Sequence, residues 1–282
     1  MKIVTTIEEA KEQVREWKSQ GLTVGLVPSM GYLHEGHASL MKAAVSQMDR
    51  VAVSVFVNPT QFGPNEDYDS YPRDLDHDIA VCEEQEVDMI FHPSVEEMYG
   101  KNYNTYVTME TLGDELCGRS RPIHFRGVCT VVTKLFNILT PDKAFFGQKD
   151  AQQLAIIKRM VKDLNMNLEV VGCPIIREDD GLAKSSRNTY LNPEERKAAL
   201  ILSKTIFMGQ KMVEQGERDV KTLLDAMKAN IETEPLAKID YVEVVDGETM
   251  QKVEKIEDSV LVAMAVYIGN TRLIDNFIYE CK

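Results

Sequence analysis

Two histidines three residues apart, His34 and His37, are the side chains whose type and spacing point most directly to chemistry. They follow an apolar run at residues 24–27 and a turn containing Gly31, and a segment with apolar residues at helical spacing comes next. The zinc motif His-Glu-x-x-His needs histidines four apart, so it does not apply. Two imidazoles where a helix follows a buried strand are typical of a site for phosphate. A simple helix cap or a solvated pair remains an open alternative, because short motifs often occur by chance.

Two further groups of polar residues lie later in the chain. Lys149 and Asp150 precede a helical pattern that contains Gln153. A lysine there suits a nucleotide phosphate, although a capping box made by Asp150 and Gln153 explains the same residues. Residues 184–188 place two serines between a lysine and an arginine, which can bind polyphosphate but is also common in solvated linkers. Neither the dinucleotide fingerprint nor the P-loop occurs in the sequence.

The elements that must position these residues alternate between strand and helix. Strands are predicted at residues 24–27, 51–57, 89–91, 106–109, 144–146 and 168–171, with helices at 76–85, 125–139 and 151–164 among them. This alternation predicts an α/β fold, a Rossmann-like parallel sheet with helices on both faces, within a domain of residues 1–176. Residues 177–282 predict a smaller α+β domain. Its helices run from Asn192 to Gly216 and over 220–231, and its strands cover 239–245, 260–267 and 273–279.

Composition limits the class of protein. The 282 residues carry a net charge of −13, which argues against a broad surface for nucleic acid but allows a small phosphorylated ligand. The five cysteines form no Cys-x-x-Cys pair, and no apolar run reaches the length needed to span a bilayer. We therefore expect a cytoplasmic protein with small-molecule substrates, no nucleic-acid partner and no membrane partner.

The motifs together closely resemble the pantothenate synthetase family, which belongs to the nucleotidyltransferases with a His-x-Gly-His motif. The resemblance runs in order through the first ~190 residues, and the rest matches only in layout. Two positions depart from the family pattern: Gln148 replaces a common Glu, and Lys184 replaces a usual Met or Leu. The matching segments are residues 28–37, 56–62, 71–74, 124–128, 145–150 and 177–188.

The resemblance implies the reaction. ATP would drive the condensation of (R)-pantoate with β-alanine through pantoyl adenylate, giving pantothenate, AMP and diphosphate on the route to coenzyme A. It also implies Mg²⁺ and a homodimer. A carboxylate is already ionised at pH 7, so the first step needs no base, and catalysis must come from holding anions together and stabilising phosphate charge.

The resemblance also assigns site residues. His34, His37, Lys149, Ser186 and Arg187 would be catalytic, with His37 as proton donor. Gln61 and Gln153 would bind pantoate, and Gln61 would also meet β-alanine. No metal ligand is predicted from the protein. The ATP-binding set would be Met30, Gly31, Tyr32, Leu33, His34, Glu35, Gly36, His37, Gly147, Gln148, Lys149, Asp150, Ile176, Lys184, Ser185, Ser186 and Arg187.

Two other functions fit parts of the pattern. A nucleotidyltransferase for a phosphorylated coenzyme precursor, or a fragment of a tRNA synthetase, would keep the fold and change the acceptor. The acidic balance weakens the synthetase, and Gln61 and Gln153 suit an uncharged polyol acid better than a second phosphate. An ATP-binding sensor module would require an incomplete catalytic set, whereas every member is present here.

Overall fold

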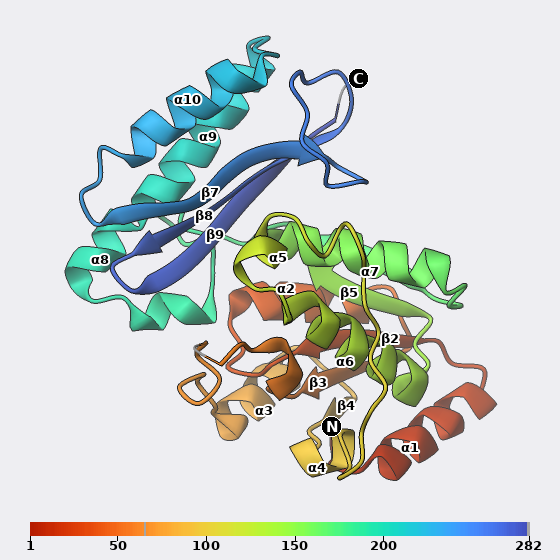
Figure 1. The fold of residues 1–282 in the computed structure, drawn as a ribbon. Helices are drawn as coiled ribbons and strands as arrows, with labels where there is room; N and C mark the ends of the chain where they lie inside the picture. Colours follow the sequence, from red (N-terminus) through yellow and green to blue (C-terminus); the bar gives the residue numbers. More distant parts are fainter. Residues whose placement is uncertain (65, 281–282) are drawn as a thin grey trace.

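The computed structural model describes residues 1–64 and 66–280, which contain two sheets (Figure 1). The larger sheet has the strand order β1-β4-β3-β2-β5-β6, and all of its pairings are parallel. Its central strands read as continuous apolar runs because helices cover both faces. The strands are β1 (Lys2–Val4), β2 (Val24–Ser29), β3 (Arg50–Val55), β4 (Met89–Phe91), β5 (Lys143–Gly147) and β6 (Glu169–Cys173).

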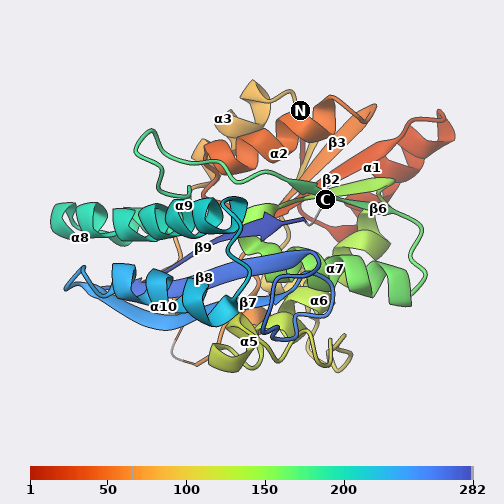
Figure 2. The ribbon, with the colours of Figure 1, turned by 90° about the horizontal axis from the view of Figure 1, so that it is seen from above.

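Two layers of helices enclose this sheet. Helices α1 (Ile7–Ser19), α6 (His124–Leu139) and α7 (Ala151–Asp163) share one apolar core. Helices α2 (Glu35–Val45) and α3 (Leu75–Glu84) pack in the core on the opposite face. Figure 2 shows α2 and α3 on one side of the strands and α6 and α7 on the other. The predicted Rossmann-like sheet with helices on both faces is confirmed.

The second sheet is antiparallel and has the order β7-β8-β9, with β7 (Ala237–Asp246), β8 (Val260–Ile268) and β9 (Thr271–Tyr279). Helices α8 (Pro193–Ala198), α9 (Leu200–Glu214) and α10 (Val220–Ile231) pack with it in a core of its own. Apolar residues on β7 and β8 also cluster with Leu116 and Ala151 of the first part. The predicted smaller α+β unit is thus present. The boundary at 176/177 falls between β6 and the 3₁₀ helix η3 (Ser186–Tyr190) and stays a prediction.

Three details of the sequence interpretation were wrong. Residues 106–109 form no strand, because the Val107 amide donates to the side chain of Thr130 (3.0 Å) rather than to a neighbouring strand. The helix predicted from Asn192 to Gly216 is divided into α8 and α9 at Ala199, whose carbonyl accepts the tighter bond from Leu202 (3.1 Å). The short strand β1 was missed, since its three residues carry too little pattern. Two short helices, α4 (Val95–Met98) and α5 (Cys117–Ser120), lie between β4 and α6 in the sequence.

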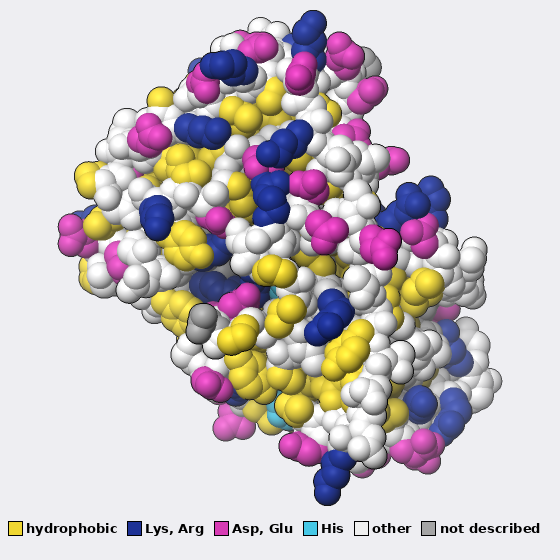
Figure 3. Space-filling model, in the orientation of Figure 1, with side chains coloured by type: hydrophobic (Ala, Val, Ile, Leu, Met, Phe, Trp, Pro, Cys, Tyr) yellow, Lys and Arg dark blue, Asp and Glu magenta, His cyan; other side chains and the backbone are white. Residues whose placement is uncertain are grey.

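Charges of both signs are interspersed on the face of the molecule drawn in Figure 3, so no basic patch dominates that face. The prediction that nucleic acid is not a partner rests on the acidic net charge of −13 and stays a prediction. Within residues 1–64 and 66–280, no helix combines the length and the apolar character that crossing a membrane requires.

Candidate active site

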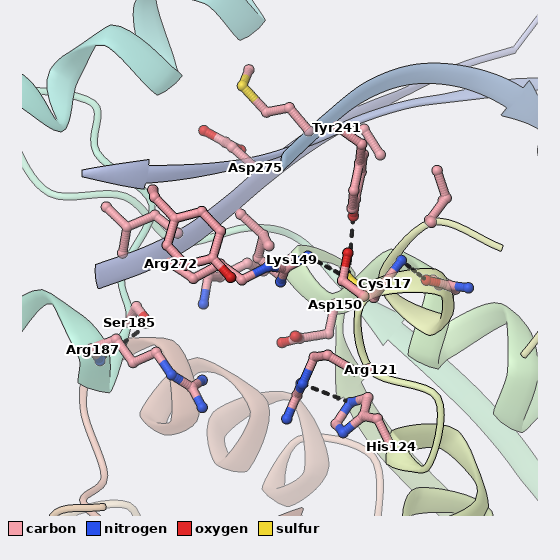
Figure 4. Close-up of a pocket in the computed structure, with 18 of the residues that line it drawn as sticks. Cys117, Arg121, His124, Lys149, Asp150, Ser185, Arg187, Tyr241, Arg272 and Asp275 are labelled. Atoms are coloured by element: carbon pink, nitrogen blue, oxygen red, sulfur yellow. Dashed lines mark hydrogen bonds between the residues drawn. The ribbon is translucent and has the colours of Figure 1, made fainter. Parts of the chain in front are cut away.

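The predicted site residues gather at the carboxyl ends of β2 and β5, which are adjacent in the sheet although far apart in sequence. From β2 the chain continues to β3 on one side, and later it returns to β5 on the other side. The strand order therefore reverses between β2 and β5, and the crevice at their carboxyl ends is the point where open α/β sheets bind ligands. A cavity of about 230 Å³ lies there, and a second of about 550 Å³ extends toward β8 and β9. The cavities share lining residues, so they form one cleft, part of which Figure 4 shows.

The turn between β2 and α2 is held by a buried carboxylate. Asp78 of α3 is 1% exposed and accepts the backbone amides of Tyr32 (3.0 Å) and Leu33 (2.7 Å). Gly31 has φ +86°, and a Cβ there would lie 2.8 Å from Asp78 Oδ2, so only glycine fits. The pKa of Asp78 is above its ordinary value, because burial raises it by more than these two hydrogen bonds lower it. Sequence reasoning missed Asp78, because nothing in the pattern of α3 separates it from neighbouring surface acids.

Both histidines are locked in one tautomer by the backbone. His34 caps α2 by accepting the Gly36 amide at Nδ1 (3.0 Å), and His37 Nδ1 accepts the His34 amide (3.2 Å). In the neutral rings the proton therefore sits on Nε2. Both residues also line the smaller cavity. His34 thus caps the helix with one ring nitrogen and keeps the other as a donor, so the cap is compatible with the predicted site role, which stays a prediction.

The two rings are neutral at pH 7. Burial lowers the pKa of His34 to about 4, and the nearby Lys149 charge contributes to the shift. Burial, His34 and Lys149 lower the pKa of His37 well below its usual value. The ring centroids are 4.1 Å apart, which is why protonating either ring disfavours the other. The pair supplies two uncharged hydrogen-bond donors for an anion.

Lys149 supplies a cation at the opposite side of the crevice, from the 3₁₀ turn η2 (Gln148–Asp150) that follows β5. Its side chain lines both cavities, and no ion pair to Nζ occurs among the described residues. Burial lowers its pKa. The capping box suggested for Asp150 and Gln153 does not form: Asp150 precedes α7 without a side-chain cap bond, and its exposed carboxylate borders the cleft.

The segment of residues 184–187, which comes from the part of the chain after β6, also lines the cleft. Ser185 Oγ accepts the Arg187 amide (3.3 Å), and the buried Ser186 hydroxyl donates to the Tyr32 carbonyl (3.4 Å), which ties the segment to the histidine turn. The Lys184 amide donates to the Ile176 carbonyl (2.9 Å). The Lys184 ammonium pairs with Glu35 and Glu178, each at 3.0 Å, so carboxylates already balance its charge.

A loop after β3 brings two acids to two of the arginines that line the cleft. Asp67 makes a bidentate pair with Arg187, at 3.0 Å to Nε and 2.9 Å to Nη2. Glu66 pairs with Arg121, which lies beside the buried His124 in Figure 4. Sequence reasoning did not find Glu66, Asp67 or Arg121, since no spacing rule connects the loop with residues so distant in sequence.

The amide of Gln61 has a defined orientation. Asn58 Oδ1 accepts the Thr60 backbone amide (3.3 Å), so Asn58 Nδ2 must be the atom that donates to the Gly127 carbonyl (3.2 Å) and to Gln61 Oε1 (3.0 Å). The Gln61 NH₂ group is then the end directed to Met30 Sδ (3.1 Å). Gln61 and Gln153 both line the smaller cavity. The same cavity has an apolar wall, formed by Phe56, Val128, Val131, Val132, Leu135 and Phe146.

Most of the predicted set therefore surrounds one cleft. Those that line it are Met30, His34, Gly36, His37, Gln61, Gly147, Lys149, Asp150, Gln153, Ile176, Lys184, Ser185, Ser186 and Arg187. Gly31, Tyr32, Leu33, Glu35 and Gln148 do not line it, and they build the turns that carry the others. Across the described residues, no three His, Cys, Asp or Glu side chains cluster as a metal site.

Comparison with known proteins gives a consistent result. The family model for pantoate-beta-alanine ligase matches residues 2–278. A pantothenate synthetase from Ruminiclostridium cellulolyticum is 63% identical over 98% of each chain. Another pantothenate synthetase, from Enterococcus faecalis, is 61% identical over the whole of both chains.

Solved structures agree. The pantothenate synthetase of Thermus thermophilus is 43% identical, has a TM-score of 0.93 and is matched over 98% of this chain and 99% of its own. A pantoate-beta-alanine ligase from Francisella tularensis, solved with a beta-gamma ATP compound and beta-alanine, is 34% identical with a TM-score of 0.80, over 99% of this chain and 97% of its own. Match length, identity and fold agree, and the chain belongs to the pantoate–β-alanine ligase family.

Proposed function

We propose that the cleft described above catalyses the ATP-dependent condensation of (R)-pantoate with β-alanine through pantoyl adenylate, a reaction of pantothenate biosynthesis. Family membership makes the chain a ligase and removes the alternatives of a synthetase fragment and a sensor module. The observation that carries the assignment to this cleft is the convergence of the two Nε2–H donors, Lys149 and Arg187 around a cavity with an apolar wall.

In the first step a pantoate carboxylate oxygen attacks the α-phosphorus of ATP, and the bond to the bridging oxygen of the departing diphosphate breaks. No proton needs to be removed, because the carboxylate is ionised. We assign charge stabilisation chiefly to Lys149, and hydrogen bonding of phosphate oxygens to His34, His37, Ser186 and Arg187, whose charge is partly balanced by Asp67. As a neutral ring, His37 first acts as a donor. To act as a proton donor, the role that the family resemblance gives it, the ring must first take up a proton from solvent, which the negative charge of bound phosphate would favour by raising its pKa.

Gln61 and Gln153 would hold pantoate against the apolar wall. Their amides orient hydroxyl and carboxylate groups without adding charge, and the fixed NH₂ group of Gln61 suits an acceptor oxygen. In the second step the free amine of β-alanine, placed beside Gln61, attacks the acyl carbon. AMP leaves with the bridging oxygen, and the nitrogen loses a proton as the amide forms.

The protein residues fit a nucleotide-bound Mg²⁺. This ion takes most of its ligands from phosphate and water and needs only one or two carboxylates. Asp150 offers one, because its exposed carboxylate borders both cavities and makes no cap bond. Mg²⁺ bound there would neutralise phosphate charge.

Two further assignments rest on the resemblance and composition. We propose a cytoplasmic location, supported by the free thiols of Cys82, Cys117, Cys129 and Cys173. We also propose a homodimer, which light scattering of the purified chain would test.

The function itself is tested by measuring AMP and diphosphate with each substrate omitted in turn. We expect AMP release only when pantoate and β-alanine are both present, and a single burst of diphosphate with pantoate alone. Diphosphate release without pantoate, or turnover only with a phosphorylated acceptor, would overturn the substrate assignment.

A further inference from the structure

A residue of the C-terminal sheet holds the turn that carries Lys149. Asn276 on β9 is 4% exposed, and its Nδ2 donates to the backbone carbonyls of Gln148 (3.1 Å) and Lys149 (2.8 Å). Both partners are acceptors only, so the amide orientation is determined and both of its hydrogens are used. The bonds therefore join the two parts of the chain at η2.

The strand that bears this amide is itself fixed. The neighbouring Asp275 is 1% exposed and makes a bidentate pair with Arg177, at 2.7 and 2.9 Å. Asp275 Oδ1 also accepts the Asn276 backbone amide (2.8 Å). Figure 4 shows Asp275 and Lys149 on the same side of the cleft. Because such a pair allows little rotation, Asn276 approaches η2 from a rigid support.

The turn needs external support. Neither η2 nor the start of α7 receives a side-chain cap bond. No other side chain among the described residues donates to the carbonyl of Gln148 or Lys149. Among the described side chains, Asn276 is therefore the one that ties these carbonyls to the C-terminal sheet.

We propose that Asn276 is a positioning residue for adenylate formation: the C-terminal sheet, through this amide, sets the place of Lys149 in the crevice. The inference rests on the role proposed above for Lys149. Removing the amide should displace the cation needed when charge develops on the phosphates far more than it disturbs pantoate binding, because Gln61 lies on another element and Gln153 lies beyond the turn, within α7.

The test compares Asn276→Ala and the near-isosteric Asn276→Asp with Asn230→Ala. Asn230 is a suitable control because it is also partly buried in the C-terminal part and donates to Thr205 Oγ1 (2.8 Å), far from the cleft. Each protein is assayed for pantoate-dependent exchange of labelled diphosphate into ATP, and its Tm is measured. Both Asn276 variants should lose about 10- to 100-fold in the kcat of exchange, with the KM for pantoate within twofold of wild type. The Asn230 variant should keep wild-type kinetics at a similar Tm loss.

The outcomes of this test distinguish the positioning role of Asn276 from the role proposed for Lys149. If Asn276→Ala folds and exchanges at the wild-type rate, or if the pantoate KM rises as much as kcat falls, the inference is overturned. Should the Asp variant fail to fold, the Ala variant carries the test alone, since it only removes atoms. Lys149→Ala is measured in parallel: if that variant stays active, the role proposed for Lys149 fails, whereas its loss beside a fully active Asn276→Ala refutes only the positioning role.

Discussion

Replacing Gly127 with alanine should disturb pantoate binding from outside the cavity. Gly127 lies in α6, where the helix touches the backbone of the 3₁₀ turn η1 (Pro59–Gln61). A Cβ there would lie 2.3 Å from the Thr60 carbonyl oxygen and 2.5 Å from Gln61 Cα. Because comfortable contacts between such atoms are roughly 3.5 Å, η1 must retreat by about 1 Å.

The size of the effect follows from that displacement. A shift of about 1 Å in a substrate-holding group can cost roughly 100-fold in rate, or about 2.7 kcal/mol of transition-state stabilisation. The same overpacking should cost about 1–3 kcal/mol of folding free energy, offset by about 1 kcal/mol from removing a helical glycine. We therefore expect kcat/KM for pantoate to fall by about two orders of magnitude while Tm drops by a few degrees.

The assay is steady-state kinetics with pantoate and ATP varied separately, together with thermal unfolding. Gly209→Ala is the matched control, because it also adds a methyl group to a helical glycine at a close contact, here 2.8 Å from Met227 Sδ. Met227 is a flexible side chain in the core of the C-terminal part, so it can move aside without disturbing the cleft. That variant should keep both kinetic constants. A Gly127→Ala enzyme with unchanged pantoate kinetics, or with equal losses for ATP and pantoate, would refute the reasoning.

Three other results are expected. Lys149→Ala should lose nearly all adenylation and keep its circular dichroism and Tm, and retained activity would contradict its role. Gln153→Ala should raise the KM for pantoate far more than that for ATP, and equal changes would remove it from the pantoate site. The ring of His34 should titrate near pH 4 by NMR in the ligand-free protein, since burial lowers its pKa; a midpoint near 6.5 would be contrary. Because the unfolded chain binds that proton more readily, the free energy of unfolding should fall as the pH decreases from 6.5 toward 4.

Much of the framework could be predicted because its signals are local. The Thr6 and Glu9 capping box of α1 and the Asn192 cap of α8 are present as short-range rules expect. The apolar run after Thr23 forms β2, and the helix begins at Glu35, one residue before the glycine of the motif. The order of strands then places the ends of β2 and β5 together.

What could not be predicted depends on contacts between distant segments. Asp78 reaches the histidine turn from 45 residues away, and Asn276 reaches η2 from 127 residues away. No periodicity or spacing marks either residue, because both are polar residues buried by tertiary packing. The capping box predicted at Asp150 failed for a different reason. The residue types and their spacing fit the capping rule, but the Asp150 carboxylate borders the cleft and makes no cap bond.

In the adenylate route the pantoate carboxylate becomes joined to AMP within this cleft. This can be measured with pantoate labelled with ¹⁸O in its carboxylate, in a complete reaction with ATP and β-alanine followed by mass spectrometry of the products. We expect one labelled oxygen in AMP and one in pantothenate, with none in diphosphate. Unlabelled AMP, or label in a phosphate or diphosphate product, would contradict the adenylate route.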